Sequence, residues 1–127
     1  MKFTLYTADC TGNPKNTVYP FETVIASADD MKKAVGFDHV CAKYKNSRRS
    51  NDNFITSDVV SVECDNDHSD KPDDWITPQM LEDELSGVNF VIVSSRHNMK
   101  PKGKKSARPR FHMFFPTGVC TSADACA

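Results

Sequence analysis

The sequence lacks the features that define several large classes of protein. None of its apolar runs approaches the roughly 20 residues of a membrane span, and residues 1–6 alternate instead of forming a secretory apolar stretch. Its five scattered cysteines include no C-x-x-C spacing, so neither a zinc ribbon nor a disulfide framework is indicated. We therefore expect a cytoplasmic protein with reduced thiols and no membrane partner.

A large net charge is also missing. The 127 residues carry 16 Lys plus Arg against 17 Asp plus Glu, a formal net charge of -1, with 39% apolar and 26% charged residues. This composition is ordinary for a soluble globular protein and disfavours both wholesale disorder and a globally basic nucleic-acid binder. The length predicts a single domain over residues 1–127.

The charge that is present is strongly segregated along the chain. Between Glu63 and Glu84 there are nine acids and one base, Lys71. Between Arg96 and Arg110 there are seven bases and no acid. A block of like charge repels itself unless it is solvated or bound to an opposite charge. The acidic segment could therefore hold cations and the basic segment phosphate, although solvated loops would give the same pattern.

Alternation and cap signals organise the first half of the chain. Strands are predicted over 2–7 and within 16–27, and the capping-box pattern Ser27–Asp30 predicts a helix, with an interruption at Gly36. Residues at near-helical spacing extend that pattern: Met31, Ala34, Val35, Cys41 and Tyr44. The polar stretch 46–53 reads as a loop, and the β-branched run 59–65 predicts a central strand that ends in acids.

The second half adds a helix and a hairpin. Thr77-Pro78 is typical of an N-cap followed by proline at the first helical position, and Gly87 ends that helix. Strands over 88–93 and 111–116 are predicted to pair through a long cationic loop. A cap-like pattern at 121–124 predicts one more helix start. We expect an α+β fold with a mixed or antiparallel sheet and two or three helices.

Two acids and one histidine are the candidates for chemistry. Glu63 and Asp65 are two apart in a strand, so both carboxylates point to the same face. Mg²⁺ and Mn²⁺ favour oxygen ligands, and paired carboxylates with substrate phosphates can hold one or two such ions. His112 lies in an otherwise aromatic and aliphatic strand, where an imidazole needs a polar partner. It is a candidate phosphate donor, with His97 as the weaker alternative, and Asp67 is expected in a polar turn.

These residues belong to a series of segments that resembles a known family. The segments are Asp38–Lys45, Asn51–Ile55, Val62–Asp70, Asp74–Pro78, Ser94–Lys100 and Arg108–Pro116. They resemble phage and mobile-element members of the archaeo-eukaryotic primase superfamily. The resemblance implies a primase-polymerase catalytic domain in which Glu63 and Asp65 match the metal-binding acid-x-acid strand end. It also implies that His112 matches the histidine that contacts the incoming nucleotide.

The chain departs from the family pattern in two places. The leading acid is Glu63 where aspartate would be commoner, which lengthens the reach to metal by one methylene. The family's third acid, on a later strand, has no clear counterpart, because the only acid after Pro116 is Asp124 in a cap-like context. We therefore expect the chain to be the N-terminal part of a catalytic domain, and the resemblance does not imply activity for the chain by itself.

The implied function is metal-dependent, template-directed nucleotidyl transfer in DNA replication. Glu63 and Asp65 would hold Mg²⁺ or Mn²⁺, while His112, Arg110 and Arg108 would contact a nucleoside triphosphate. The basic residues expected on the DNA template or primer are Lys100, Lys102, Lys104, Lys105 and Arg96, with Arg48 and Arg49 as weaker candidates. The family also implies a downstream helicase domain or replication protein as a partner.

Two other functions fit the same residues. A nucleic-acid-binding module without catalysis would use the basic segment alone, although few aromatic residues lie there to stack on bases. A metal-dependent nuclease would use the paired carboxylates with water as the nucleophile.

Overall fold

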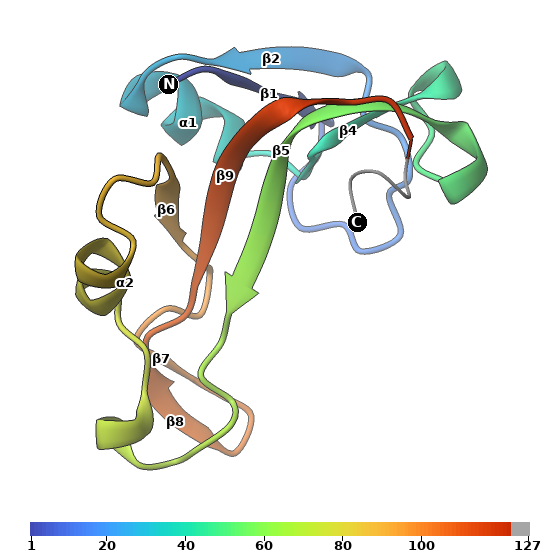
Figure 1. Cartoon of the computed structure of the whole chain (residues 1–127). Coiled ribbons are helices and arrows are strands. Elements are labelled where there is room, and N and C mark those ends of the chain that lie inside the picture. Colours follow the sequence, from blue (N-terminus) through green and yellow to red (C-terminus); the bar gives the residue numbers. More distant parts are fainter. Residues whose placement is uncertain (123–127) are drawn as a thin grey trace. The chain divides into compact units, whose positions relative to one another are not determined.

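The computed structural model describes residues 1–122, which form an α+β fold (Figure 1). The chain divides into two compact units: unit 1 contains residues 1–60 and the segment that begins at Pro116, and unit 2 contains residues 61–115. The predicted α+β class is confirmed, since two α-helices accompany antiparallel strand pairs. The expectation of a single domain stays a prediction.

Unit 1 contains a three-stranded antiparallel sheet in the order β2-β1-β3. Its strands are β1 (Phe3–Thr7), β2 (Phe21–Ile25) and β3 (His39–Val40). In the central strand β1, Phe3 and Leu5 are fully buried, as the alternating pattern predicts. The second predicted run is shorter in the structure than in the sequence pattern, because only its last part pairs with β1.

Helix α1 (Ala28–Val35) begins at the predicted cap. The Ser27 hydroxyl accepts a hydrogen bond from the Asp30 amide at 3.2 Å, and the Asp30 carboxylate accepts one from the Ala26 amide at 3.0 Å. These bonds satisfy amides that a helix start otherwise leaves unpaired. Met31 and Ala34 form the buried side of the helix.

The predicted continuation of this helix to Cys41 and Tyr44 is wrong. The helix ends at Gly36, and the chain enters β3 and then β4 (Ala42–Tyr44). Asp38, just after the helix, accepts hydrogen bonds from the amides of Gly12 and Asn13 at 2.6 and 2.8 Å. The contact of Asp38 with the turn at Gly12, together with the pairing of β3 and β4 in sheets, therefore determines the conformation here. The helical spacing of the apolar residues does not.

The second sheet has four strands in the order β4-β5-β9-β6. The inner strands are β5 (Phe54–Cys64) and β9 (Phe111–Cys120), and the outer strands are β4 and β6 (Val91–Ser94). The predicted pairing of the last two apolar runs is confirmed, with Val93 opposite His112. The predicted strand end at Pro116 is wrong, because β9 continues to Cys120. The predicted polar loop contains two short 3₁₀ turns, η1 (Lys45–Ser47) and η2 (Asn51–Asn53).

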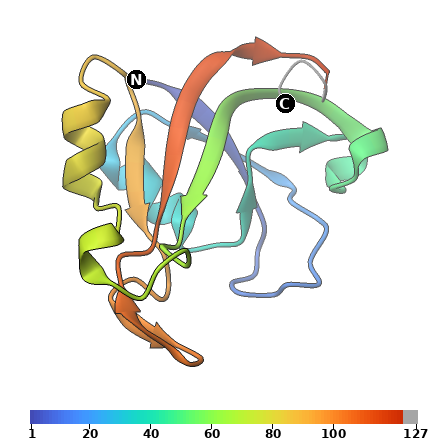
Figure 2. The ribbon, with the colours of Figure 1, turned by 60° about the horizontal axis from the view of Figure 1, so that its bottom comes forward.

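Unit 2 also carries a helix, a 3₁₀ turn and a small hairpin. These are α2 (Pro78–Glu84), η3 (Pro72–Asp74), β7 (Lys100–Lys102) and β8 (Lys105–Arg108). Helix α2 begins at the predicted cap Thr77, whose hydroxyl accepts from the Met80 amide at 3.3 Å, and it lies beside β6 (Figures 1 and 2). Gly87, with a φ of 87°, follows its end as predicted.

The basic segment is a hairpin where the sequence predicts an open loop. Lys100 pairs with Arg108 and Lys102 with Lys105, and Gly103 takes a left-handed φ of 61° in the turn. Glycine adopts this conformation without the steric cost that a side chain would bring. Lys100, Lys102 and Lys105 therefore lie on paired strands, and Lys104 lies in the turn between them.

The described residues include no helix that is both long enough and apolar enough to cross a membrane. Of the predicted helix start at 121–124, Ala123 and Asp124 lie outside the described residues.

Candidate metal and phosphate site

Glu63 and Asp65 lie at the end of β5 in unit 2. Glu63 is the last residue but one of the strand, and Asp65 follows directly after Cys64. The Glu63 side chain is 58% exposed and that of Asp65 is 27% exposed. Both carboxylates are therefore open to solvent, which a metal ligand needs before an ion arrives.

His112 faces Glu63 from the neighbouring strand β9. The distance from His112 Nε2 to Glu63 Oε1 is 3.8 Å, and the imidazole is partly exposed. A proton on the imidazole would make this contact an ion pair, and either ring nitrogen can donate to an anion when it carries a proton. The structure thus brings together the acid and the histidine that the sequence singled out.

Arg110 repeats this arrangement one step further along the strands. Its Nη1 lies 3.9 Å from Asp65 Oδ1 and 2.9 Å from Asp67 Oδ1. The acids at 63 and 65 therefore face the bases at 112 and 110 in opposite order along the chain. Arg110 is fully buried, and its Nε and Nη2 have no hydrogen-bond partner among residues 1–122.

Asp67 lies in the turn after β5, as predicted, and it is held from two sides. Arg110 Nη1 donates to its Oδ1, and Lys105 Nζ of β8 lies 3.2 Å from its Oδ2. Partial desolvation alone would raise the pKa of Asp67. The hydrogen bonds and charges of Arg110 and Lys105 outweigh that effect, so the pKa lies below its ordinary value.

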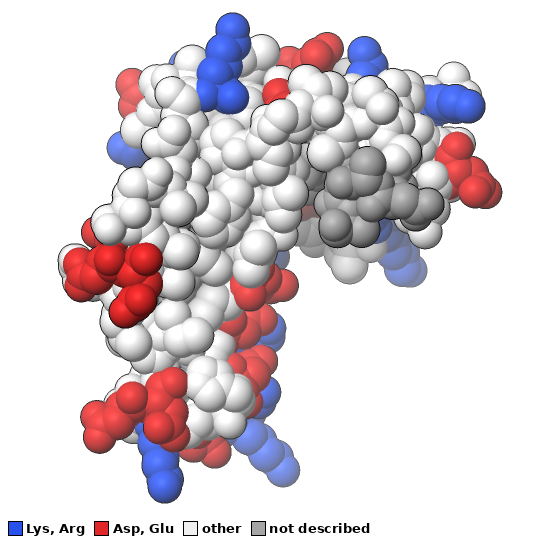
Figure 3. Space-filling view, viewed as in Figure 1, with Lys and Arg blue, Asp and Glu red and all other residues white. Residues whose placement is uncertain are grey.

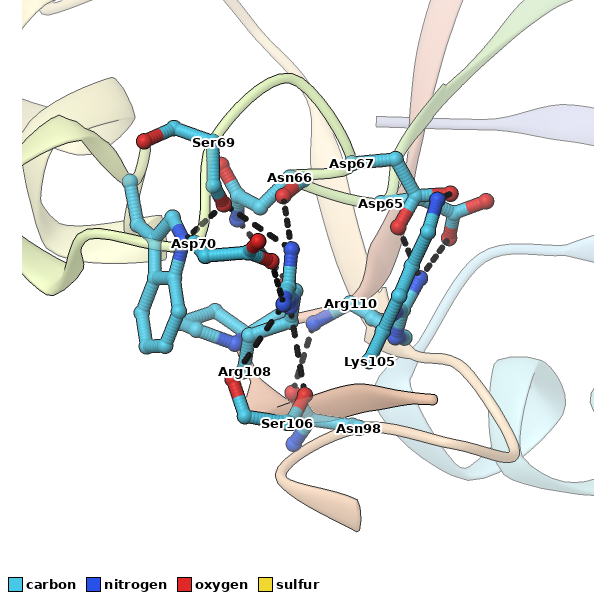
Figure 4. Close-up of polar contacts among 12 residues, drawn as sticks. Asp65, Asn66, Asp67, Ser69, Asp70, Asn98, Lys105, Ser106, Arg108 and Arg110 are labelled. Carbon is cyan, nitrogen blue, oxygen red and sulfur yellow. Dashed lines mark hydrogen bonds and ion pairs between the residues drawn. The ribbon is translucent and has the colours of Figure 1, made fainter. Parts of the chain in front are cut away.

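Arg108 anchors the acidic loop (Figure 4). It is fully buried, and its Nη1 donates to the carbonyl oxygens of Asn66 and Ser69, each at 2.9 Å. Its Nη2 donates to Asp70 Oδ1 at 2.8 Å, and its guanidinium carbon lies 5.2 Å from the centre of the Trp75 ring. Nε and Nη2 also donate to Ser106 of the same hairpin, so every nitrogen of the guanidinium has an internal partner.

Asn66 completes this frame between the two aspartates. Its backbone is left-handed, with a φ of 54°, and the residue is almost fully buried. Its Nδ2 donates to the carbonyls of Ile76 and Pro109 at 2.9 and 2.8 Å, and its Oδ1 accepts from the Ile76 amide at 2.8 Å. Asparagine tolerates left-handed backbone better than most residues, so this turn fits the sequence locally.

The other predicted basic residues lie on the surface of unit 2. Lys100, Lys102 and Lys104 are exposed on the β7–β8 hairpin, and Arg96 is exposed in the turn after β6. In Figure 3, acidic and basic side chains lie side by side at the hairpin end of unit 2, and further acids gather over α2. Of the weaker candidates in unit 1, Arg49 lies over the Tyr19 ring at 5.9 Å, and Arg48 pairs with Val18 in an isolated bridge.

The carboxylates of Glu63 and Asp65 are suitable ligands for a hard cation, but they do not form a complete coordination shell. Carboxylate oxygens are the ligands that Mg²⁺ and Mn²⁺ favour. Within residues 1–122, however, no group of three or more His, Cys, Asp or Glu side chains is placed to hold a metal. Glu63 and Asp65 could therefore supply only part of a coordination shell, and a substrate phosphate or water would have to supply the rest.

Asn66, Asp70 and Trp75 are the residues of this region that sequence reasoning missed. Asn66 and Trp75 enter the sequence analysis only as members of the resembling segments Val62–Asp70 and Asp74–Pro78. One signal was present: two arginines around Pro109, directly before a buried strand, need acceptors if they become buried. The identity of those acceptors depends on the return of the chain from β5, which spacing does not encode.

Comparisons of this chain with protein-family models, with curated proteins and with solved structures find no match.

Proposed function

We propose that this chain carries the metal-binding and nucleotide-binding residues of a DNA primase-polymerase, which performs metal-dependent nucleotidyl transfer. The observation that carries the proposal is the pairing of Glu63 on β5 with His112 on β9, 3.8 Å apart. An acid-x-acid strand end beside a histidine-bearing strand is the arrangement that the family resemblance implies.

In this proposal, Glu63 and Asp65 bind one edge of a Mg²⁺ or Mn²⁺ ion whose remaining ligands include triphosphate oxygens. Such ions commonly use one or two carboxylates together with substrate phosphates, which suits a site with too few protein ligands to form a cage. The ion would neutralise charge on the transferred phosphoryl group. His112 donates to a phosphate oxygen from the opposite strand.

The two buried arginines enter the proposal differently. Arg110 has unpartnered Nε and Nη2 donors, but both atoms are buried, so a phosphate contact would require the surrounding loop to open. Arg108 has internal acceptors for all its guanidinium nitrogens, and a phosphate contact would require it to leave them. In the proposal, Arg108 therefore acts mainly through the loop that it holds.

The exposed lysines of the β7–β8 hairpin provide the proposed contact to a DNA template or primer. Such contacts to phosphate give salt-dependent affinity that does not depend on sequence. The setting we propose is cytoplasmic replication of a phage or mobile element, with a helicase domain or replication protein as a partner.

Manganese binding tests the proposed metal site directly. Mn²⁺ added to the ¹⁵N-labelled chain with a nucleoside triphosphate should broaden the backbone amides around Glu63, Asp65 and His112 first. Asp65→Asn should abolish this broadening, whereas Asp73→Asn, which removes an exposed acid from the same acidic segment, should preserve it. Diffuse broadening over residues 67–74 in all three proteins would contradict the proposal.

A non-catalytic nucleic-acid-binding module is the second candidate, and the hairpin favours it. Lys100 and Lys102 on β7 and Lys104 in the turn are exposed, and their contacts to phosphate would need no metal. If DNA binding with a steep salt dependence survives both Glu63→Ala and chelation, and no Mn²⁺ site is found, the module becomes the better account.

A further inference from the structure

Lys105 connects the basic hairpin to the acidic loop through a contact that solvent can reach. Its Nζ lies 3.2 Å from Asp67 Oδ2, with the two side chains 45% and 39% exposed. Exposed ion pairs of this kind contribute little to stability, because water and salt compete for both partners. A second anion could therefore replace the carboxylate at Lys105 at small cost.

The other basic contacts of this loop are not exchangeable in the same way. Arg110 and Arg108 are fully buried and hold Asp67 and Asp70 from below the surface. Asp67 thus contacts the buried Arg110 through Oδ1 and the exposed Lys105 through Oδ2 (Figure 4). If Lys105 leaves, Arg110 still holds the carboxylate beside Asp65.

Lys105 also differs from its neighbours on the hairpin. Lys100, Lys102 and Lys104 are exposed and form no ion pair with any residue of 1–122, whereas Lys105 is engaged by Asp67. A row of lysines on one short hairpin suits an extended polyanion better than a single phosphate group.

We propose that a phosphate of a nucleic-acid backbone displaces Asp67 from Lys105 when a strand binds the β7–β8 hairpin. This inference rests on the nucleic-acid binding in the proposed function and adds its regulation. The exchange would leave Asp67 Oδ2 without its Lys105 partner, on a carboxylate whose other oxygen contacts the same Arg110 Nη1 that lies near Asp65 of the proposed cation site. Nucleic-acid binding and cation binding would then favour each other, and the coupling must be reciprocal.

A double-mutant cycle on DNA affinity tests the exchange without any metal. Binding of a fluorescein-labelled single-stranded oligonucleotide to the full chain is followed by anisotropy, at one salt concentration and with a chelator present. Asp67→Asn should tighten binding, because Lys105 no longer has to leave a carboxylate. Asp73→Asn is the matched control: it removes an equal charge from an exposed acid that forms no ion pair with any residue of 1–122.

We expect Asp67→Asn to tighten binding roughly two- to fivefold more than Asp73→Asn, the range that the usual strength of an exposed ion pair allows. The extra effect should vanish in a Lys105→Gln background. Equal effects of the two aspartate variants, or an effect of Asp67→Asn that persists in Lys105→Gln, would overturn the inference. The absence of DNA binding by the unaltered chain would overturn it too.

Two further comparisons test the exchange, one with lysine variants and one with a different anion. If Asp67→Asn unfolds the loop, Lys105→Gln is compared with Lys102→Gln. Lys105→Gln should weaken DNA binding less, because the unaltered Lys105 must give up its ion pair with Asp67 to bind a phosphate. An equal or larger loss would overturn the exchange. The same comparison is made with a nucleoside triphosphate in place of DNA. If Asp67→Asn changes the affinity for the nucleotide but not the affinity for DNA, the anion that exchanges is not a nucleic-acid backbone and the inference is overturned. Since no metal is present, failure of the proposed metal site would leave these outcomes unchanged.

Discussion

Replacing Arg108 by methionine should destabilise unit 2 by about 3–5 kcal/mol. Methionine keeps a long unbranched side chain but has no donors for the carbonyl oxygens of Asn66 and Ser69. A hydrogen bond from a charged group contributes about 1.5–3 kcal/mol, so losing two of them sets the lower end of the range. Loss of the cation–π contact between the guanidinium and the Trp75 ring adds to the destabilisation.

Arg108 also forms an ion pair with Asp70, and replacing Asp70 should have a much smaller effect. Asp70 is 87% exposed, so Asp70→Asn leaves Arg108 with its carbonyl acceptors and exposes no buried charge. That variant should cost under about 1 kcal/mol, as exposed ion pairs usually do. The two partners of a 2.8 Å contact should thus differ severalfold in their effects on the free energy of unfolding.

Urea denaturation is a suitable assay, because the single tryptophan lies within this network. Fluorescence of Trp75 reports on unit 2, and far-ultraviolet circular dichroism checks that the change is one of stability. Lys104→Met on the same hairpin is the control for replacing an exposed base. A loss of less than about 1 kcal/mol for Arg108→Met, or equal losses for Arg108→Met and Asp70→Asn, would refute the assignment of Arg108 as the anchor.

Two other expectations concern the acidic loop. Asn66→Ala should destabilise the chain more than Asn66→Gly, by about 1 kcal/mol in the free energy of unfolding, because both lose the side-chain bonds but only alanine resists the left-handed backbone; equal losses would contradict this. The pKa of Asp67 is lowered in the folded state, so its contribution to stability is present above the ordinary value of 3.8 and disappears as pH falls through the lower folded value. The stability difference between the unaltered chain and Asp67→Asn, measured by denaturation at several pH values, should therefore shrink on acidification below that value, and a difference that grows there would contradict the assignment.

Local signals account for the elements that the sequence predicted well. The caps at Ser27 and Thr77 each place a hydroxyl at the start of a real helix. Alternation located β1, and the pairing of the two last apolar runs followed from their composition. Such features are decided by neighbouring residues, which is why they can be read without a structure.

The errors arise where distant contacts decide the conformation. Helical spacing continues past Gly36, yet Asp38 is committed to the turn at Gly12 and the chain turns into strands. Within the site, the sequence predicted Glu63 and His112 as separate candidates, and their facing depends on β5 and β9 being neighbours in the sheet, which spacing along the chain does not encode. The burial of Arg108 and Arg110 was not predicted, because two arginines in a basic segment look solvated until their acceptors from the β5 turn are known.

Nucleotide binding with and without manganese tests the central claim most directly. Calorimetric titration of a nucleoside triphosphate should show binding that depends on Mn²⁺, since Glu63 and Asp65 supply only part of a coordination shell. His112→Ala should weaken that binding about fivefold or more, through the loss of one hydrogen bond to phosphate, whereas His97→Ala, at an exposed turn, should not change it. Binding that needs no Mn²⁺ and is unaffected by His112→Ala would contradict a shared metal and nucleotide site at the end of β5.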